Sequence, residues 1–176
     1  MFFQIRIFNG QSRFDPELQV PAPVRKGSLM YFGAISVEGP ICLVKVVGNL
    51  NSVGYEKLLQ DHLLPYLDKK GRDLVFMQDN ASIHTSKYMK DFFLREGIFL
   101  MRWPAKSPDL NPIENAWGLL KLWLADKSPN NLDELDVLVQ QGWNEIVTEQ
   151  YCRALFGSMP RRVKELKKNE GGRINY

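Results

Sequence analysis

The stretch SLMYFGAISVEGPICLVKVV (residues 28–47) decides the fold. Its two apolar runs, residues 28–36 and 41–47, have the composition of buried β-strands. The sequence EGP between them (residues 38–40) is a turn signal, and it is short enough to join the two strands directly. The stretch therefore predicts an antiparallel hairpin.

Further strands and helices are predicted on both sides of this hairpin. Upstream, residues 2–8 are aromatic and β-branched, which predicts a first strand. Downstream, apolar residues between 55 and 67 recur every three or four positions, the period of a helix with one buried face. The remaining predicted elements are a strand over 73–77, a helix over 86–96, a strand over 98–101, a helix over 113–124, and two or three helices within 132–168.

This order of elements predicts an α/β fold of the ribonuclease H-like class. Three antiparallel strands, a crossover helix and two short parallel strands with flanking helices would give a mixed sheet with an antiparallel edge. At 176 residues, with no internal repeat or long linker, the chain is expected to form a single domain over residues 1–176.

Composition excludes several classes of protein. No apolar run approaches the roughly 18 residues of a membrane-spanning helix, so no membrane partner is expected. Cys42 and Cys152 lie far apart and match neither a disulfide framework nor a zinc site. The net charge of +3 is unevenly distributed, because a basic tail over about 158–176 includes Arg161 and Arg162. Such a tail either binds phosphates or forms a solvated helix end.

One apolar run, LVFMQDN (residues 74–80), ends on the carboxylate of Asp79. In open α/β sheets, ligands bind at the carboxyl ends of the strands, so Asp79 is a candidate metal ligand. The alternative is that Asp79 and Asn80 form a turn and cap the next helix.

A second carboxylate, Glu114, stands in SPDLNPIENAW (residues 107–117), in the first turn of a predicted helix. With Asn111 as N-cap and Pro112 at the first helical position, Glu114 also resembles part of a capping box, so helix capping is the alternative. The combination favours a site, because 34 residues separate Asp79 from Glu114 and both flanking motifs are unusual.

These motifs carry a resemblance to a known family. FMQDNASIHTS and WPAKSPDLNPIENAWGLLK resemble the second and third catalytic motifs of Tc/mariner transposases, including the 34-residue gap of the Tc branch. RKGSLMYFGAISVEGP, GNLNSVGYEKLLQDHLLPYL and LFGSMPRRVKEL resemble the family's hairpin, the helix before its second Asp and its C-terminal end. The resemblance covers nearly the whole chain.

The resemblance implies a DDE-class catalytic domain that cuts and joins DNA. In such a site two divalent ions, Mg²⁺ or Mn²⁺, stand about 3.5–4 Å apart and act on the attacking and leaving oxygens. Carried over to this sequence, Asp79 is the second acid of the triad and Glu114 is the third. The resemblance also implies DNA as the partner, a possible homodimer and a nuclear location.

The family's first acid belongs to a motif of Asp-Glu followed by a small and an aromatic residue, and these 176 residues contain no such motif. FFQIRIFNGQSRF resembles the family's segment directly after that motif, so the expected Asp falls just before Met1. Asp15 precedes Pro16 and fits a turn residue better. We therefore expect this chain, by itself, not to cut or join DNA. The family's upstream helix-turn-helix region is also expected to be missing.

Four basic residues are candidate DNA-phosphate contacts: Arg102, Lys106, Arg161 and Arg162. His84 lies where the family also tends to carry a His, either near the rim of the site or as a structural residue. Two other functions stay open at this point. One is a non-catalytic, domesticated or remnant module that binds DNA or a partner protein. The other is a nuclease or retroviral-type integrase of the same fold, although neither is expected to carry SPDLNPIENAW or SMPRR.

Overall fold

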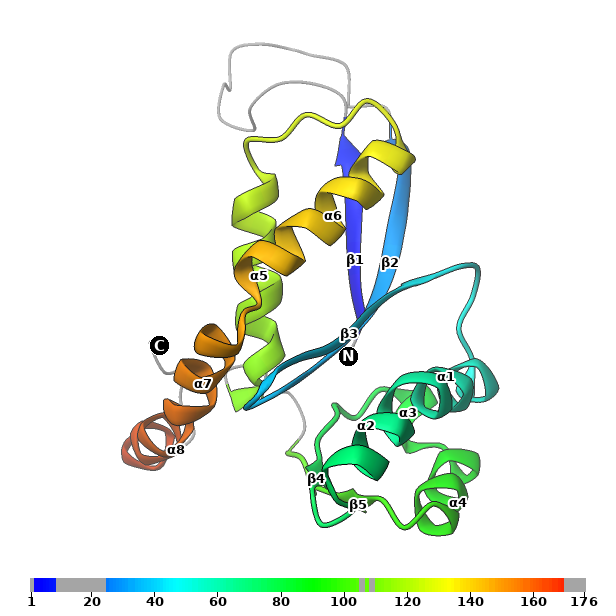
Figure 1. Cartoon of the computed structure of the whole chain (residues 1–176), viewed down its shortest axis with the longest axis vertical. Helices are drawn as coiled ribbons and strands as arrows, with labels where there is room; N and C mark the ends of the chain where they lie inside the picture. Colours follow the sequence, from blue (N-terminus) through cyan, green and yellow to red (C-terminus); the bar gives the residue numbers. More distant parts are fainter. Residues whose placement is uncertain (1, 9–24, 105–106, 108–109, 170–176) are drawn as a thin grey trace.

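The computed structural model describes residues 2–8, 25–104, 107 and 110–169 (Figure 1). The strands are β1 (Phe2–Phe8), β2 (Arg25–Ser36), β3 (Gly39–Val46), β4 (Val75–Phe76) and β5 (Phe99–Leu100). The helices are α1 (Ser52–Leu58), the π-helical turn η1 (Leu59–Leu63), α2 (Leu64–Lys70), α3 (Ser82–Thr85), α4 (Lys87–Arg95), α5 (Pro112–Leu124), α6 (Leu132–Ile146), α7 (Glu149–Gly157) and α8 (Met159–Lys168). Within these ranges no helix has the length and apolar content needed to cross a membrane. The predicted order of strands and helices is confirmed, except that α3 is an additional short helix that the sequence did not predict.

The first three strands form an antiparallel sheet in the order β1-β2-β3. The predicted hairpin is present, because β2 and β3 pair from Met30 opposite Val46 to Ser36 opposite Gly39. Gly39 turns the chain with a φ of 129°, a conformation that favours glycine. β1 extends the sheet on the other side of β2, with Phe2 opposite Phe32.

The short strands β4 and β5 pair in parallel, with Val75 opposite Phe99. Over the described ranges the strands therefore form two hydrogen-bonded sheets, whereas the sequence predicted one mixed sheet. The difference arises because β4 and β5 are only two residues long. They pair with each other, and in the described ranges they form no strand pairing with β1, β2 or β3. The predicted strands over 73–77 and 98–101 were correspondingly too long.

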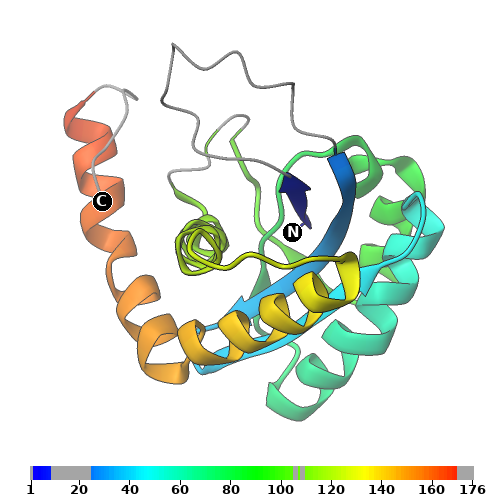
Figure 2. The same cartoon turned by 90° about the horizontal axis from the view of Figure 1, so that it is seen from above.

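Helices cover both faces of β2, which explains why this strand is apolar throughout and does not alternate. Leu29 and Tyr31 join a core with α5, α6 and α7. Phe32, on the opposite face, joins a second core with residues of α1, η1, α2 and α4. Figure 2 shows the two groups of helices, α1 to α4 (cyan to green) and α5 to α8 (yellow-green to red), on either side of the strands. The result is a three-layer α/β/α arrangement.

Helix α5 packs closely on β2 at Gly33. A Cβ atom at this position would lie 2.5 Å from Cη2 of Trp117, so a larger residue would push the helix away. Trp117 is almost fully buried and packs on Trp143 of α6, with ring centroids 4.8 Å apart. Since α5 also carries Glu114, this contact fixes the second candidate acid relative to the sheet.

Both cysteines are free thiols. Cys42 is half-buried on β3, and its burial raises the pKa of the thiol to about 11. Cys152, a residue of α7, is buried in the core, and burial also raises the pKa of its thiol. Neither thiol is therefore primed as a nucleophile near neutral pH.

Candidate active site

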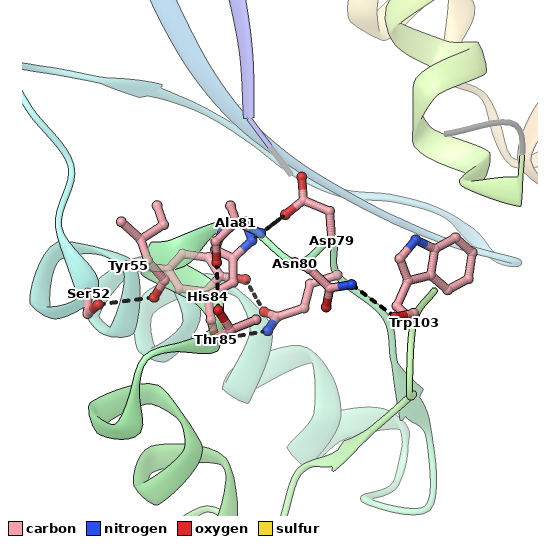
Figure 3. A network of polar contacts seen from close by, with 10 residues as sticks. Ser52, Tyr55, Asp79, Asn80, Ala81, His84, Thr85 and Trp103 are labelled. Carbon is pink, nitrogen blue, oxygen red and sulfur yellow. Dashed lines mark hydrogen bonds and ion pairs between the residues drawn. The ribbon is translucent and has the colours of Figure 1, made fainter. Parts of the chain in front are cut away.

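Asp79 lies just beyond the carboxyl end of β4, with its side chain 43% exposed. Its Oδ1 accepts a hydrogen bond from the backbone N–H of Ala81 (3.1 Å) and lies 2.6 Å from Nδ1 of His84 (Figure 3). The contact with Ala81 is the turn that the sequence offered as an alternative. Both contacts use Oδ1. Among the described residues no such contact is made to Oδ2, so this oxygen remains available to a ligand.

His84 is the buried hydrogen-bond partner of Asp79. Its side chain is 1% exposed in α3, a short helix that begins three residues after Asp79. An ionised carboxylate only accepts hydrogen bonds, so Nδ1 of His84 must carry the proton in this contact. The hydrogen bond from His84 is the main cause of the lowered pKa of Asp79, which keeps this carboxylate charged at neutral pH.

A buried network in turn fixes His84. The ring of Tyr55 packs against the imidazole with centroids 4.4 Å apart, and the Tyr55 hydroxyl donates to Oε1 of Gln78 at 2.7 Å. Nε2 of Gln78 donates to the backbone oxygen of His84 at 3.2 Å. From the sequence, Tyr55 was predicted only to pack the buried face of a helix, and Gln78 was not singled out. The only signal for Gln78 was a polar residue ending an apolar strand.

Glu114 is the third residue of α5 and is half-buried. Burial is the largest cause that raises the pKa of Glu114, and the negative charge of Asp79 raises this pKa further. The structure therefore brings the two acids within electrostatic range of each other, although they come from separate segments of the chain. Asn111 makes no side-chain cap hydrogen bond to α5, so the capping box suggested by the sequence does not form.

Lys121 is a further charged residue near this pair that the sequence analysis missed. It lies on α5 two turns after Glu114, is exposed, and its positive charge lowers the pKa of Glu114. A spacing of seven residues puts both side chains on one face of a helix, and this spacing was the available signal. Glu114 therefore shares its face of α5 with a cation.

The loop that leads to α5 is tied to the end of β4. Nδ2 of Asn80 donates to the backbone oxygen of Trp103 at 2.9 Å (Figure 3). The neighbouring candidate for a phosphate contact, Arg102, is exposed. Lys106 falls outside the described residues.

The two candidate arginines of α8 have different environments. Arg161 is exposed and forms an ion pair with Glu165 at 2.9 Å. Arg162 is only 4% exposed, and its guanidinium donates to Oδ1 of Asn115 and to Oγ of Ser158, both at 2.8 Å. A phosphate contact by Arg162 was therefore the wrong prediction, because its side chain is buried and hydrogen-bonded to Asn115 of α5. The end of the predicted basic tail, residues 170–176, falls outside the described ranges.

The side chains around the two acids offer carboxylate oxygens as the possible ligands of a metal ion. In the described part of the chain, no group of three or more His, Cys, Asp or Glu side chains is placed to hold a metal. Carboxylate oxygens nevertheless suit hard cations, and Mg²⁺ is typically held by one or two carboxylates together with water and substrate phosphates. A divalent ion would also relieve the repulsion between Asp79 and Glu114 that raises the pKa of Glu114. The pair fits Mg²⁺ or Mn²⁺ on these grounds.

Comparison with known proteins gives the family. A family model described as "DDE superfamily endonuclease" matches residues 9–136. The transposable element Tc3 transposase of Caenorhabditis elegans is 36% identical over 153 residues, which cover 85% of this chain and 46% of that protein. The Tcb1 transposase of Caenorhabditis briggsae is 33% identical over 167 residues, which cover 94% of this chain and 61% of that protein. The chain thus spans about half the length of the relatives it matches.

Solved structures give the same fold at lower sequence identity. A Mos1 transposase paired-end complex with the left transposon end superimposes with a TM-score of 0.80 at 18% identity, covering 99% of this chain and 55% of that one. The catalytic domain of Mos1 mariner transposase gives a TM-score of 0.74 at 16% identity, covering 99% of this chain and 83% of that one. The ribonuclease H-like α/β fold class is confirmed. The chain belongs to the DDE superfamily endonucleases, as a domain of the Tc/mariner transposase type.

Proposed function

We propose that this domain carries out the strand cleavage and strand transfer of DNA transposition, with Asp79 and Glu114 as two of its catalytic acids. The observation that carries the proposal is the placement of Asp79 at the carboxyl end of β4, where His84 and Ala81 contact Oδ1 and Oδ2 remains available to a ligand. Glu114, whose pKa is raised by burial and by the charge of Asp79, would supply the second carboxylate for phosphodiester chemistry with divalent ions. The comparisons favour this function over a non-catalytic module.

The proposed cofactor is Mg²⁺ or Mn²⁺. Oδ2 of Asp79 and the carboxylate of Glu114 would hold it, while His84 keeps Asp79 in place through Oδ1. When bound, a divalent ion activates the attacking oxygen and stabilises the leaving oxygen of a phosphodiester. Structures of the Mos1 catalytic domain with Mg and with Mn support this choice of ion.

The proposed partner is transposon DNA. The Mos1 complexes, one with a transposon end and one at the strand-transfer stage, support this choice. On this chain the exposed cations Arg102, Lys121 and Arg161 are the proposed phosphate contacts. A homodimer and a nuclear location remain proposals that rest on the family alone.

A chimera tests the proposed function. The part of the Tc3 transposase that precedes its matching region would be joined to this chain, and cleavage of a duplex with Tc3 terminal repeats would be measured in Mg²⁺. We expect metal-dependent cleavage at the transposon end that is lost in Asp79→Ala. Cleavage that is equally strong in Asp79→Ala would contradict the proposal.

This chain alone is predicted not to nick terminal-repeat DNA, in either Mg²⁺ or Mn²⁺. The reason is that no residue of the chain matches the family's first acid, so a shared metal ligand is lacking. A nicking assay on labelled duplex checks this, with the chimera as the positive control. Metal-dependent nicking by the chain alone that Asp79→Ala abolishes would show that a third acid is not required.

The affinity of the site for Mn²⁺ is expected to fall as the pH falls. Burial raises the pKa of Glu114, whereas the His84 hydrogen bond lowers the pKa of Asp79, so on acidification Glu114 takes up a proton first. Protons and metal compete for this carboxylate. Mn²⁺ titrations from pH 7.5 downward should therefore show an early loss of affinity in the unmodified chain. Glu114→Gln should already lack this affinity at pH 7.5, and Mn²⁺ binding in this variant that falls with pH as it does in the unmodified chain would contradict the assignment.

A further inference from the structure

Helix α8 reaches the acid-bearing helix α5 through one buried cation, Arg162. Its guanidinium NH1 donates to Oδ1 of Asn115, the residue that follows Glu114, across a separation of 47 residues in the chain. Nε of the same guanidinium donates to Oγ of Ser158 at the start of α8. Oγ of Ser158 in turn donates to the backbone oxygen of Leu155 in α7 at 2.6 Å. One side chain thus links the turn between α7 and α8 to the first turn of α5.

Burial of a guanidinium is costly unless it is well hydrogen-bonded. Moving such a group out of water carries a large free-energy cost, and apolar residues of similar size often fill a helix interface at least as well. Arg162 is nevertheless only 4% exposed. Its geometry, with planar donors directed at two separate acceptors, is one that lysine or an apolar residue would not reproduce.

The first turn of α5 is contacted from outside the helix, because Arg162 donates to the side chain of Asn115. α7 also approaches this turn, because Phe156 lines the same cavity of about 350 Å³ as Pro112 and Ile113. The first turn of α5 therefore has neighbours in both α7 and α8.

We propose that Arg162 is a positioning residue for the metal site: by holding Asn115, it fixes the first turn of α5 so that Glu114 faces Asp79. This inference rests on the proposed function, because it assumes that Glu114 is a metal ligand. It gives the C-terminal helices a role in the chemistry, although they supply no acid to the site. Residues that orient metal ligands typically change metal affinity by about 10- to 100-fold when they are removed.

The test measures the Mn²⁺ affinity of the full chain. The affinity is obtained from the broadening of backbone amide NMR signals during a Mn²⁺ titration. We expect Arg162→Met to weaken binding about tenfold or more, and Asn115→Ala to weaken it by a similar factor. Because both substitutions remove the same contact, between Arg162 and Asn115, the double variant should bind Mn²⁺ about as weakly as either single variant. Arg162→Lys should lie between Arg162→Met and the unmodified chain.

The controls separate positioning from general stability. Arg153→Met removes the same charge from the exposed surface of α7, where Arg153 pairs with Glu149, and should leave Mn²⁺ affinity unchanged. Thermal unfolding defines a temperature at which every variant is folded, and the affinities are compared there. If Arg162→Met and Asn115→Ala lower the melting temperature but bind Mn²⁺ like the unmodified chain, Arg162 is only structural and the inference is wrong. If the unmodified chain shows no Mn²⁺ binding that depends on Glu114, the proposed function itself fails.

Discussion

Glu114→Gln is expected to lower the rate of DNA cleavage by the Tc3 chimera by about 10³-fold. The substitution keeps the size of the side chain and removes its charge, so a divalent ion loses one of its two carboxylates on this chain. A metal ion contributes several kcal/mol of charge stabilisation in the transition state. Since each 1.4 kcal/mol corresponds to a factor of ten in rate, about 4 kcal/mol corresponds to this factor. Single-turnover cleavage of a labelled transposon end in Mg²⁺ measures the effect.

The matched control is Asp126→Asn. Asp126 lies just beyond the far end of α5, its side chain is 76% exposed, and the substitution removes one negative charge in the same way. This variant should cleave at nearly the rate of the unmodified chimera. A loss of rate in Glu114→Gln no larger than in Asp126→Asn would show that Glu114 does not act on the reaction.

Trp117→Ala is expected to lower the free energy of unfolding by about 3–5 kcal/mol, the usual cost of removing a large buried aromatic side chain. Trp117 is 1% exposed, packs on Trp143, and lies in contact with the backbone at Gly33. Alanine would leave a cavity between α5, α6 and β2. Urea unfolding followed by circular dichroism measures the change.

Leu122→Ala serves as the comparison on the same helix. Leu122 is 71% exposed, so this substitution removes an apolar side chain from α5 without opening a cavity. Surface substitutions of this kind usually change stability by less than about 0.5 kcal/mol. Equal losses in the two variants would mean that the packing of Trp117 on Gly33 and Trp143 does not hold α5 to the sheet.

Much of the fold could be predicted because its signals are local. The apolar runs and the turn over residues 28–47 are sufficient for the β2–β3 hairpin, and periodicity is sufficient for the long helices. The division of the strands into two sheets could not be predicted, since it depends on which backbone groups meet across the fold. The π-helical turn over Leu59–Leu63 was likewise hidden, because the apolar spacing there fits a continuous helix.

The site was predictable in part for the same reason. Asp79 and Glu114 stand out because each ends or begins an element within a distinctive motif. The contact of His84 with Asp79 depends on how α3 is oriented relative to the segment that follows β4. No spacing in the sequence specifies this orientation. Arg162 was misassigned because basic residues in a charged run are usually solvated, whereas here one of them lies against α5.

The most direct test of the central claim is a map of bound Mn²⁺ on the chain. Paramagnetic broadening of backbone amide signals would be recorded at low Mn²⁺ concentration for the unmodified chain, Asp79→Asn and Glu114→Gln. One shared site predicts that amides around Asp79 and amides in the first turn of α5 broaden together, and that either substitution removes both effects. Broadening confined to one of the two segments, or broadening at Glu114 that survives Asp79→Asn, would contradict a single metal site built from these two acids.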